Sequence, residues 1–400
     1  MQKMNLAQRA LGISPSPTLS IDAKAKKMIA QGLDVINFGV GEPDFDTPQH
    51  IKDAAMEAIQ KGMTKYTAVA GTDQLKQAIV AKFKQDNGLD YQPGQIVVSC
   101  GAKHSLYNAF QVLCQPGDEV ILPAPYWVSY LEQIKLAGAQ PVIVNTRQEN
   151  DFKLTVAELE AAITPRTRLI ILNSPSNPTG SVYTRQELAA LGEVLVKHKI
   201  AIISDEIYEK LIYDGLEHVS IASLSPELKE QTVVINGVSK SYAMTGWRIG
   251  YAAAPAAVAK AMADLQSHST SNPTSIAQAA SVAALTGTQQ PLQDMLREFN
   301  RRRDFMLERI RQIPGVQCRQ PGGAFYLFPD VSSYFGKSYR GRVVSSASDL
   351  ADLLLEEARV ALVPGIAFGD DRFIRLSYAT SMEKIAQGLE RIAALLDGIK

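Results

Sequence analysis

Lys240 and Arg248 lie in one glycine-containing segment, 236–250, between the apolar runs 232–235 and 251–254. These flanks predict a buried loop between two strands. A buried lysine loses hydration, which lowers its pKa toward that of an amine able to attack a carbonyl. Arg248 supplies a permanent planar charge suited to phosphate or carboxylate. Taken alone, such a lysine is more often a surface residue, and such an arginine is more often an ion-pair partner. Together, the two residues fit an aldehyde cofactor that carries a phosphate.

Other residues that could take part in such chemistry follow further apolar runs. Gly101, Ala102 and Lys103 follow 96–99, Trp127 follows 119–122, Asn177 follows 168–172, and Asp205 and Tyr208 follow 200–204. Ligands of parallel sheets bind beyond the carboxyl ends of the strands, and a glycine before a helix N-terminus favours phosphate. Each residue could instead be a cap, a turn or a packing residue. Their shared position at one sheet edge predicts a binding site.

The elements that position these residues follow an α/β pattern. Strand-like runs alternate with helical segments, which predicts an α/β domain whose mostly parallel sheet is covered by helices on both faces. The expected helices are 22–32, 51–62, 72–85, 105–113, 130–138, 157–163 and 185–198. From about residue 257 the pattern becomes mainly helical, with helices at 258–268, 275–285, 292–313, 348–358 and from 382, and strands at 323–328, 360–363 and 373–377. We expect a large domain over 50–288 and a smaller α+β domain built from 1–49 and 289–400.

The composition excludes several other classes of protein. Lys+Arg and Asp+Glu number 41 each, so no net charge favours nucleic acid or an anionic membrane as a partner. Cys100, Cys114 and Cys318 are far apart and lack the spacing of metal ligands, so we expect reduced thiols and no metal site. The N-terminus lacks the apolar core of a signal peptide, and no apolar run reaches about 18 residues, so a cytoplasmic location is expected.

The motifs taken together resemble a known family. They are Ser-Pro-Ser-Asn-Pro-Thr-Gly at 174–180, Ile-Ser-Asp-Glu-Ile-Tyr at 203–208, Ser-Lys-Ser-Tyr at 239–242 and Gly-Trp-Arg-Ile-Gly at 246–250. Their order and spacing resemble the class I pyridoxal-phosphate aminotransferases of fold type I, from about residue 15 to the C-terminus. Among these, the chain is most similar to bacterial aspartate aminotransferases with a lysine in the phosphate-cup turn. The resemblance implies a seven-stranded sheet in the large domain and pyridoxal 5'-phosphate as cofactor.

The resemblance also implies a role for each residue. Lys240 would form the Schiff base and move the substrate proton, and Asp205 would pair with the ring nitrogen. Tyr208 and Asn177 would contact the phenolic oxygen of the ring, and Trp127 would stack on the ring and contact substrate. The backbone at Ala102 and Lys103 would hold the phosphate together with Arg248 and with Tyr66 from a neighbouring subunit, which implies a homodimer with shared active sites. Arg375 would bind the substrate α-carboxylate with Gly41 and Asn177.

One position departs from the family pattern. The best-known aspartate enzymes use an arginine of the partner subunit for the distal carboxylate, and Ser267 aligns with that arginine. Lys103, Thr18 and Ser271 of the partner subunit are the candidates to replace it. We therefore expect ping-pong transamination between L-aspartate and 2-oxoglutarate, giving oxaloacetate and L-glutamate. An aminotransferase for aromatic, glutamate or prephenate-type substrates, or a β-lyase, stays open, whereas intact Lys240, Asp205 and Arg248 disfavour a non-catalytic regulator.

Overall fold

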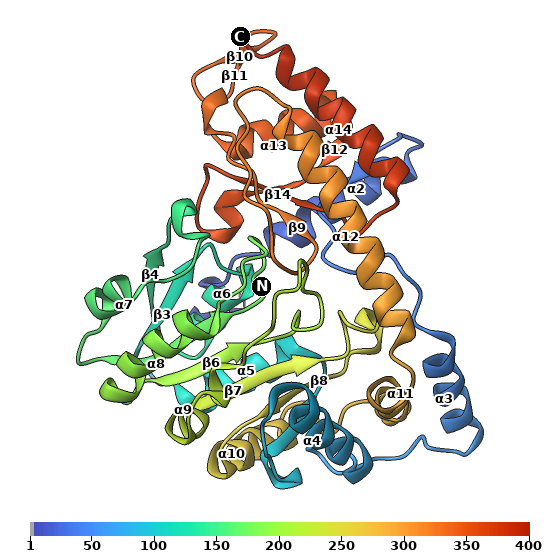
Figure 1. Cartoon of the computed structure of the whole chain (residues 1–400), viewed down its shortest axis with the longest axis vertical. Coiled ribbons are helices and arrows are strands. Elements are labelled where there is room, and N and C mark those ends of the chain that lie inside the picture. Colours follow the sequence, from blue (N-terminus) through green and yellow to red (C-terminus); the bar gives the residue numbers. More distant parts are fainter. Residues whose placement is uncertain (1–3) are drawn as a thin grey trace.

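A seven-stranded sheet forms the centre of the protein in a computed structural model that describes residues 4–400. The strand order is β2-β8-β7-β6-β5-β3-β4 (Figure 1). The bounds are β2 (Ile96–Ser99), β3 (Glu119–Ala124), β4 (Gln140–Asn145), β5 (Thr167–Asn173), β6 (Ala201–Asp205), β7 (Thr232–Gly237) and β8 (Gly250–Ala253). All neighbours are parallel except β8, which runs antiparallel to β2 and β7. The predicted mostly parallel sheet is confirmed.

Helices cover both faces of the sheet because successive strand residues point to opposite sides. Val97 packs into the core under α5, α6 and α10, whereas Ile96 and Val98 pack into the core under α3, α4 and α11. Ile202 lies in a third core under α7, α8 and α9. The bounds are α3 (Gln49–Gln60), α4 (Asp73–Asn87), α5 (Ala102–Leu113), α6 (Val128–Leu136), α7 (Val156–Ala162), α8 (Arg185–His198), α9 (Pro226–Gln231), α10 (Ala256–Ser267) and α11 (Ser275–Thr286).

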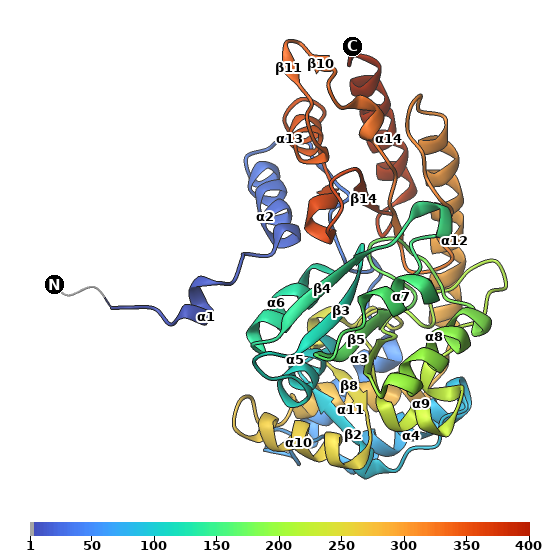
Figure 2. The same ribbon diagram turned by 90° about the vertical axis from the view of Figure 1, so that its left-hand side faces the viewer.

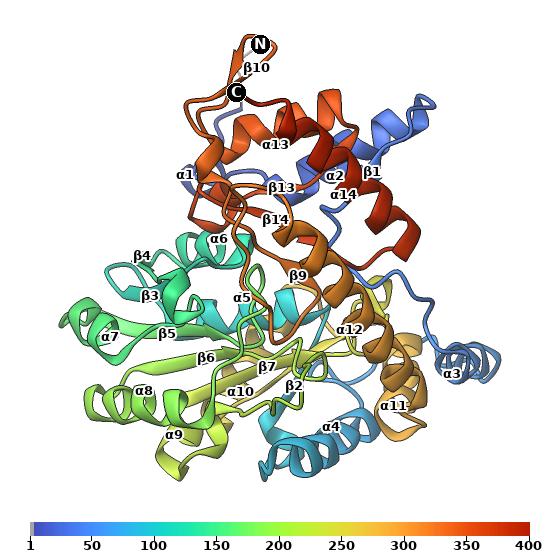
Figure 3. The ribbon, with the colours of Figure 1, turned by 45° about the horizontal axis from the view of Figure 1, so that its top comes forward.

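The C-terminal third packs around a separate three-stranded sheet of order β13-β14-β9. Long helix α12 (Gln290–Arg311) leads into this part, which also contains α13 (Ala347–Glu357) and α14 (Met382–Asp397) (Figure 3). Its strands are β9 (Tyr326–Leu327), β13 (Val363–Pro364) and β14 (Ile374–Ser377), and β12 (Val360–Ala361) pairs in parallel with β1 (Ile36–Asn37). Because β1 joins this part, Ile36 and Phe38 share one core with C-terminal residues, and this core also reaches Ile207 and Tyr208 beside the central sheet.

Several predicted boundaries were wrong. The helix expected from residue 105 begins at Ala102, because Gly101 at φ +89° ends the loop and lets the helix start directly after it. The helix expected from residue 22 begins at Pro17, a residue whose fixed φ suits a first helical turn. The strand expected at 360–363 is divided between β12 and β13, which pair with different partners. Helix α9 and the two-residue strands β10 (Ser338–Tyr339) and β11 (Arg342–Val343) were not predicted.

The N-terminal segment stands apart from the rest of the chain. Helix α1 (Gln8–Leu11) extends away from the sheet and is followed by α2 (Pro17–Ala30), which lies beside the C-terminal part (Figure 2). Leu6 and Leu11 of this segment are 65% and 61% exposed. Across residues 4–400, none of the helices combines the length and the apolar character needed to cross a membrane.

Candidate active site

One cavity of about 540 Å³ lies at the carboxyl ends of the central strands, between the sheet and the C-terminal part. Loop 38–48 and helix α2 form its remaining wall. The predicted site residues that line it are Thr18, Gly41, Ala102, Lys103, Trp127, Asn177, Asp205, Tyr208, Lys240, Arg248 and Arg375. Segments far apart in the sequence therefore meet at the sheet edge where ligands of such folds bind.

Lys240 lies in the loop between β7 and β8, as its apolar flanks predicted. Its amine donates a hydrogen bond to the backbone carbonyl of Gly41 at 2.5 Å and lies 5.9 Å from the ring centre of Tyr208. Burial lowers the pKa of Lys240 to about 8, and the positive charges of Arg248 and Arg375 act in the same direction. An amine with this pKa is partly unprotonated near neutral pH and can act as a nucleophile.

Asp205 is the last residue of β6 and is only 3% exposed. Its carboxylate accepts hydrogen bonds from the Tyr130 hydroxyl at 2.6 Å and from the Ile207 backbone N–H at 3.2 Å. Burial raises the pKa of Asp205 to about 6, although both hydrogen bonds oppose that rise. The carboxylate is therefore ionised at neutral pH and faces the same cavity as Lys240.

Close backbone packing builds an anion cradle at the start of α5. A Cβ at Gly101 would lie 2.2 Å from Nη2 of Arg248, and a Cβ at Gly250 would lie 2.0 Å from the backbone nitrogen of Ala102. Only glycine leaves room for the guanidinium and for strand β8 at these two points. Arg248 donates to the carbonyls of Thr245 at 2.8 Å and Cys100 at 3.3 Å, which fixes its guanidinium beside the free N–H groups of the helix.

Lys103 and Trp127 form the neighbouring wall of the cavity. The Lys103 amine lies 4.9 Å from the centre of the Trp127 ring, a cation–π distance. Burial lowers the pKa of Lys103, and the nearby charge of Arg248 lowers it further. Trp127 also packs edge-on against Tyr130, the residue that holds Asp205. The indole is thus fixed beside the carboxylate.

Arg375 supplies a second anion site from β14. It is 2% exposed and donates to Asn177 Oδ1 at 2.9 Å and to the Gly39 carbonyl at 2.8 Å. The guanidinium lies 4.4 Å from the ring centre of Tyr326, and burial lowers the pKa of Arg375. Its Nε is buried without a hydrogen-bond partner in the part of the chain that the structure describes. A buried charge with an unused donor suits an anionic ligand.

Sequence reasoning missed two tyrosines of this site. Tyr130 holds Asp205, and Tyr326 shares a hydrogen bond with the hydroxyl of Tyr208 at 2.8 Å. Both lie in segments that read as packed secondary structure, where a tyrosine resembles any core aromatic residue. The only signal in the sequence was the residue type itself, since a buried tyrosine hydroxyl requires a polar partner.

Three predicted residues lie elsewhere. Tyr66 is 92% exposed in the loop between α3 and α4. Ser267 ends α10 and donates to the Asp264 carbonyl at 2.6 Å, and Ser271 lies in the loop that follows with φ +61°. Among the described residues of a single chain, none of these three lines the cavity.

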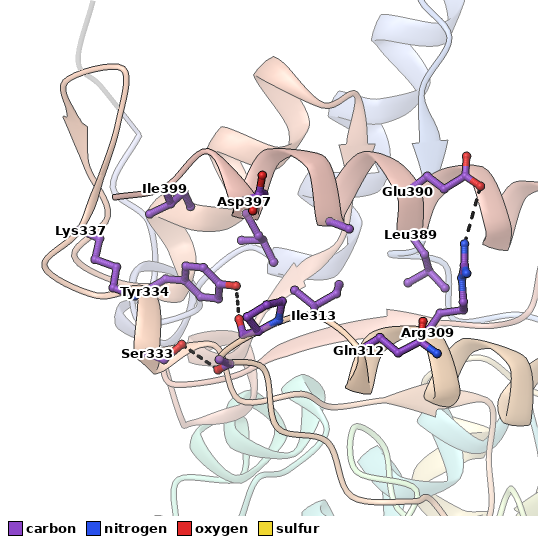
Figure 4. A pocket seen from close by; sticks show the side chains of 14 residues that line it. Arg309, Gln312, Ile313, Ser333, Tyr334, Lys337, Leu389, Glu390, Asp397 and Ile399 are labelled. Atoms are coloured by element: carbon purple, nitrogen blue, oxygen red, sulfur yellow. Dashed lines mark hydrogen bonds and ion pairs between the residues drawn. The ribbon is translucent and has the colours of Figure 1, made fainter.

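A larger hollow of about 680 Å³ lies at the far end of the C-terminal part, where α12 and α14 approach each other (Figure 4). It contains the Arg309–Glu390 ion pair at 3.8 Å and a hydrogen bond from Ser333 to the Gly315 carbonyl at 2.7 Å. The sequence motifs place no residue there. The smaller cavity is therefore the candidate active site, because the amine, the carboxylate and both arginines meet in it.

Comparison with known proteins agrees with this geometry. The profile of the family described as aminotransferase class I and II matches residues 33–392. An aspartate aminotransferase of Geobacillus stearothermophilus is 55% identical over 98% of this chain and 99% of its own length. An aspartate/prephenate aminotransferase of Nitrosomonas europaea is 50% identical over 98% of this chain and all of its own length. The crystal structure of the aspartate aminotransferase from Rhizobium meliloti superposes with a TM-score of 0.96 at 48% identity and covers 100% of both chains.

Proposed function

The chain belongs to the class I and II aminotransferase family, and from this membership we propose that it transfers the amino group of L-aspartate to 2-oxoglutarate. The products would be oxaloacetate and L-glutamate, formed in a ping-pong reaction. One observation carries the proposal: the Lys240 amine, the Asp205 carboxylate and the Arg375 guanidinium line the same cavity. Aminotransferases that act on aspartate and match nearly the whole chain support the choice of substrate.

The residues of the cavity fit pyridoxal 5'-phosphate, the cofactor of this family. The cradle at Gly101, Ala102 and Arg248 leaves space where a side chain at position 101 would collide with the guanidinium, which supports a phosphate there. The Asp205 carboxylate suits a protonated ring nitrogen, and Trp127 offers a flat surface for the ring. When bound, the cofactor supplies a reactive carbonyl and an electron-withdrawing ring that accepts the electron pair released at the substrate Cα.

In this mechanism each residue has a distinct task. Lys240 holds and moves the proton of the substrate Cα, a role that its pKa of about 8 allows near neutral pH. The ionised Asp205 carboxylate would accept a hydrogen bond from the protonated ring nitrogen and keep that nitrogen protonated, and Tyr130 keeps the carboxylate in position. Tyr208 and Asn177 donate to the oxygen on the ring. Several of these groups are buried, which strengthens their electrostatic effect on a bound ligand.

Substrate recognition rests on two cations. Arg375, with its unused Nε donor, binds the α-carboxylate next to Asn177 and the backbone of Gly41. Lys103 contacts the distal carboxylate, with Thr18 and Ser271 of the partner subunit as further candidates, because Ser267 cannot take the place of an arginine. A lysine is a single point charge and constrains geometry less than an arginine fork. Substrates other than aspartate are therefore compatible with this wall.

The proposal includes a homodimer. Tyr66 reaches the phosphate of the neighbouring subunit, and its 92% exposure in a single chain supports such a partner contact. Residues 50–288 would form the large domain, and 1–49 with 289–400 the small domain that contributes Arg375 and Gly41, with residues 1–3 lying outside the described part of the chain. A cytoplasmic location is favoured by three unpaired cysteines.

A second candidate function is prephenate transamination. It is favoured by the aspartate/prephenate aminotransferase that is 50% identical to this chain. Prephenate also carries two carboxylates, so Arg375 and Lys103 would serve both substrates. The two functions are compatible in one enzyme.

The function is tested with the full-length chain and added cofactor. The loaded protein should absorb in the visible range, with a band that moves with pH and is lost in Lys240→Ala. A screen of ten amino acids and prephenate with a suitable amino acceptor or donor should give the highest kcat/KM for aspartate or prephenate. Absence of the band in the wild-type protein would contradict the cofactor assignment, and a preference for alanine would contradict the substrate.

A matched variant tests the distal wall. Lys103→Ala should lower kcat/KM for aspartate about tenfold, because one charge-assisted contact is lost, and should affect alanine much less. Equal losses for both substrates would remove Lys103 from the distal site. Lys135→Ala, an exposed lysine of α6 paired with Glu132, serves as the control and should change neither value.

A further inference from the structure

A buried cluster of ionisable side chains lies behind Asp205, and no step described above uses it. Glu206 follows Asp205 in the chain but does not line the cavity, and it is 1% exposed. One side-chain atom each of Glu206, Glu209 and His218 lie within 4.8 Å of one another. Buried charges are costly unless they are paired, so the cluster needs an explanation.

Three donors converge on the Glu206 carboxylate. The hydroxyls of Ser204 and Ser220 both donate to Oε1 at 2.7 Å, and Nε2 of His218 lies 2.9 Å from Oε2. This arrangement suits an ionised carboxylate, which can accept several hydrogen bonds and donates none. Glu206 is thus a buried negative charge adjacent to Asp205.

His218 can balance that charge. Burial lowers the pKa of His218, but the carboxylates of Glu206 and Glu209 outweigh this effect and raise the pKa above its ordinary value. Its Nδ1 has no hydrogen-bond partner within residues 4–400, so this nitrogen can gain or lose a proton while Nε2 stays bonded to Glu206. Glu209 is paired with the amine of Lys82. With His218 protonated, the four groups form two neutral pairs.

The charge of Glu206 acts on Asp205. Burial is the main cause of the raised Asp205 pKa, and the neighbouring Glu206 raises it further. A Glu206 carboxylate without a counter-charge would therefore favour the protonated form of Asp205. A protonated Asp205 is a poor partner for a positively charged ring nitrogen.

We propose that His218 is a positioning residue for Asp205: its imidazolium neutralises the Glu206 carboxylate and so keeps the adjacent Asp205 carboxylate ionised toward the cavity. The inference rests on the proposed function, because only a ligand with a basic ring nitrogen requires an ionised carboxylate at this point. His218 touches neither the cavity nor the reacting atoms. It acts through Glu206 and Asp205.

Other ionisable groups also face the cluster. Tyr130, Tyr208 and Lys240 face Asp205. Tyr91 and Tyr251 face Glu206, and Lys82, Tyr242 and Tyr251 face Glu209. Asp86 and Lys210 lie at the edge of the cluster. Burial raises the pKa of these tyrosines above the ordinary value of the phenol, so they stay neutral. His218 is the member whose ordinary pKa lies closest to neutrality. The carboxylates of Glu206 and Glu209 favour its protonated form, so His218 supplies the positive charge beside Glu206.

The test measures the titration of Asp205 directly. The full-length chain, with ¹³C at the aspartate side-chain carboxyls and without cofactor, is titrated by NMR, and Asp205→Asn identifies the signal. His218→Gln keeps an amide donor for Glu206 but removes the charge, and it should raise the Asp205 midpoint by about one pH unit, a tenfold change in proton affinity. Glu206→Gln should lower the midpoint, because the imidazolium then lacks its counter-charge, and the double variant, which removes both charges, should return it close to the wild-type value. An unchanged midpoint in His218→Gln would overturn the proposal.

Two controls separate charge from structure. Ser220→Ala removes one hydrogen bond to Glu206 without changing the charge, so it should shift the midpoint by less than half as much as His218→Gln. If His218→Gln does not fold, the comparison of the double variant with Glu206→Gln decides, because the two differ only in the His218 charge; equal midpoints in the two contradict the proposal. In the loaded enzyme, His218→Gln should lower kcat several-fold while KM for aspartate stays constant, because Arg375 is untouched. If the Asp205 midpoints shift as predicted but the loaded wild-type enzyme shows no transamination, the proposed function is wrong and the electrostatic coupling between His218, Glu206 and Asp205 still holds.

Discussion

Asp205 and Glu209 are two buried carboxylates four residues apart, and their environments shift their pKa values in opposite directions. They are 3% and 6% exposed. Burial raises the pKa of Asp205 to about 6, whereas the pKa of Glu209 falls to about 2 because the charges of Lys82 and His218 and the hydrogen bond from Asn87 outweigh burial. Asp205 receives its hydrogen bonds from a neutral hydroxyl and a backbone N–H. The presence or absence of a direct cationic partner decides the direction.

The two lysines repeat this contrast. Lys82 lies between Glu209 and Asn87 Oδ1, which accepts from its amine at 2.8 Å. Lys240 has only the Gly41 carbonyl as a hydrogen-bond acceptor among the described residues, and burial lowers its pKa to about 8. The region facing the cavity thus leaves its acid and its amine without a strong partner, so both stay available to a ligand. The region behind it pairs its charges and stabilises the fold.

The largest effect is expected on the side of the cavity. Lys240→Ala should lower kcat by about a thousandfold or more, because the nucleophile and the proton carrier are both lost. The midpoint of thermal unfolding of the cofactor-free chain should change little, since Lys240 has no charged partner to leave behind. Steady-state kinetics and calorimetry measure the two quantities. If Lys240→Ala kept wild-type kcat but lowered the midpoint of thermal unfolding strongly, the distinction between the two regions would be wrong.

The paired region should respond in the opposite way. Lys82→Met leaves the Glu209 carboxylate buried without the Lys82 ammonium as a partner. This should lower the free energy of unfolding by about 3–5 kcal/mol. Transamination by the folded fraction should stay within a few-fold of wild type. Denaturant unfolding and activity at low temperature measure these effects.

A second variant serves as the control for that result. Lys82→Met with Glu209→Leu removes both charges and should recover much of the lost stability, because no unpaired charge remains. Failure of the double variant to recover stability would show that packing, and not charge pairing, holds this region together.

The lowered pKa of Lys240 predicts a pH dependence of cofactor uptake. Burial disfavours the ammonium form, so the reactive neutral amine increases as pH rises through about 8 and is lost below it. The rate at which the cofactor-free chain takes up pyridoxal phosphate should rise about tenfold per pH unit below 8 and level off above it. Stopped-flow absorbance measures this rate. A midpoint near 10 would show a fully hydrated lysine and would contradict the burial of the site.

The sequence predicted the cavity-facing region far better than the paired region behind it. Lys240 and Asp205 follow apolar runs at strand ends, and the mostly parallel sheet brings such ends together. Arg375 lies within β14 of the other sheet, and only the family resemblance predicted its place in the site. Tyr130 and the contacts of Glu206 with His218 depend on how α6 and the 209–220 loop fold back, which no local pattern encodes. The start of α5 was misplaced because a Gly101 in the left-handed region reads as a turn. Tyr66 remains a prediction, since its role requires a second chain.

The smallest effect is expected where one neutral hydrogen bond tunes the cavity acid. Tyr130→Phe removes the hydroxyl that donates to Asp205 at 2.6 Å, a contact that lowers the pKa of this carboxylate. The pKa should then rise above 6, and kcat/KM should fall about tenfold at neutral pH, with its acidic limb moved to higher pH. Tyr183→Phe is the matched control, because this buried hydroxyl accepts from the Leu154 N–H in the core under α7 and α8. It should cost about 1 kcal/mol of stability and leave the pH profile unchanged. Identical pH profiles for both variants would mean that the neutral donor does not set the charge of Asp205, and the contrast with Glu209 would then rest on Lys82 alone.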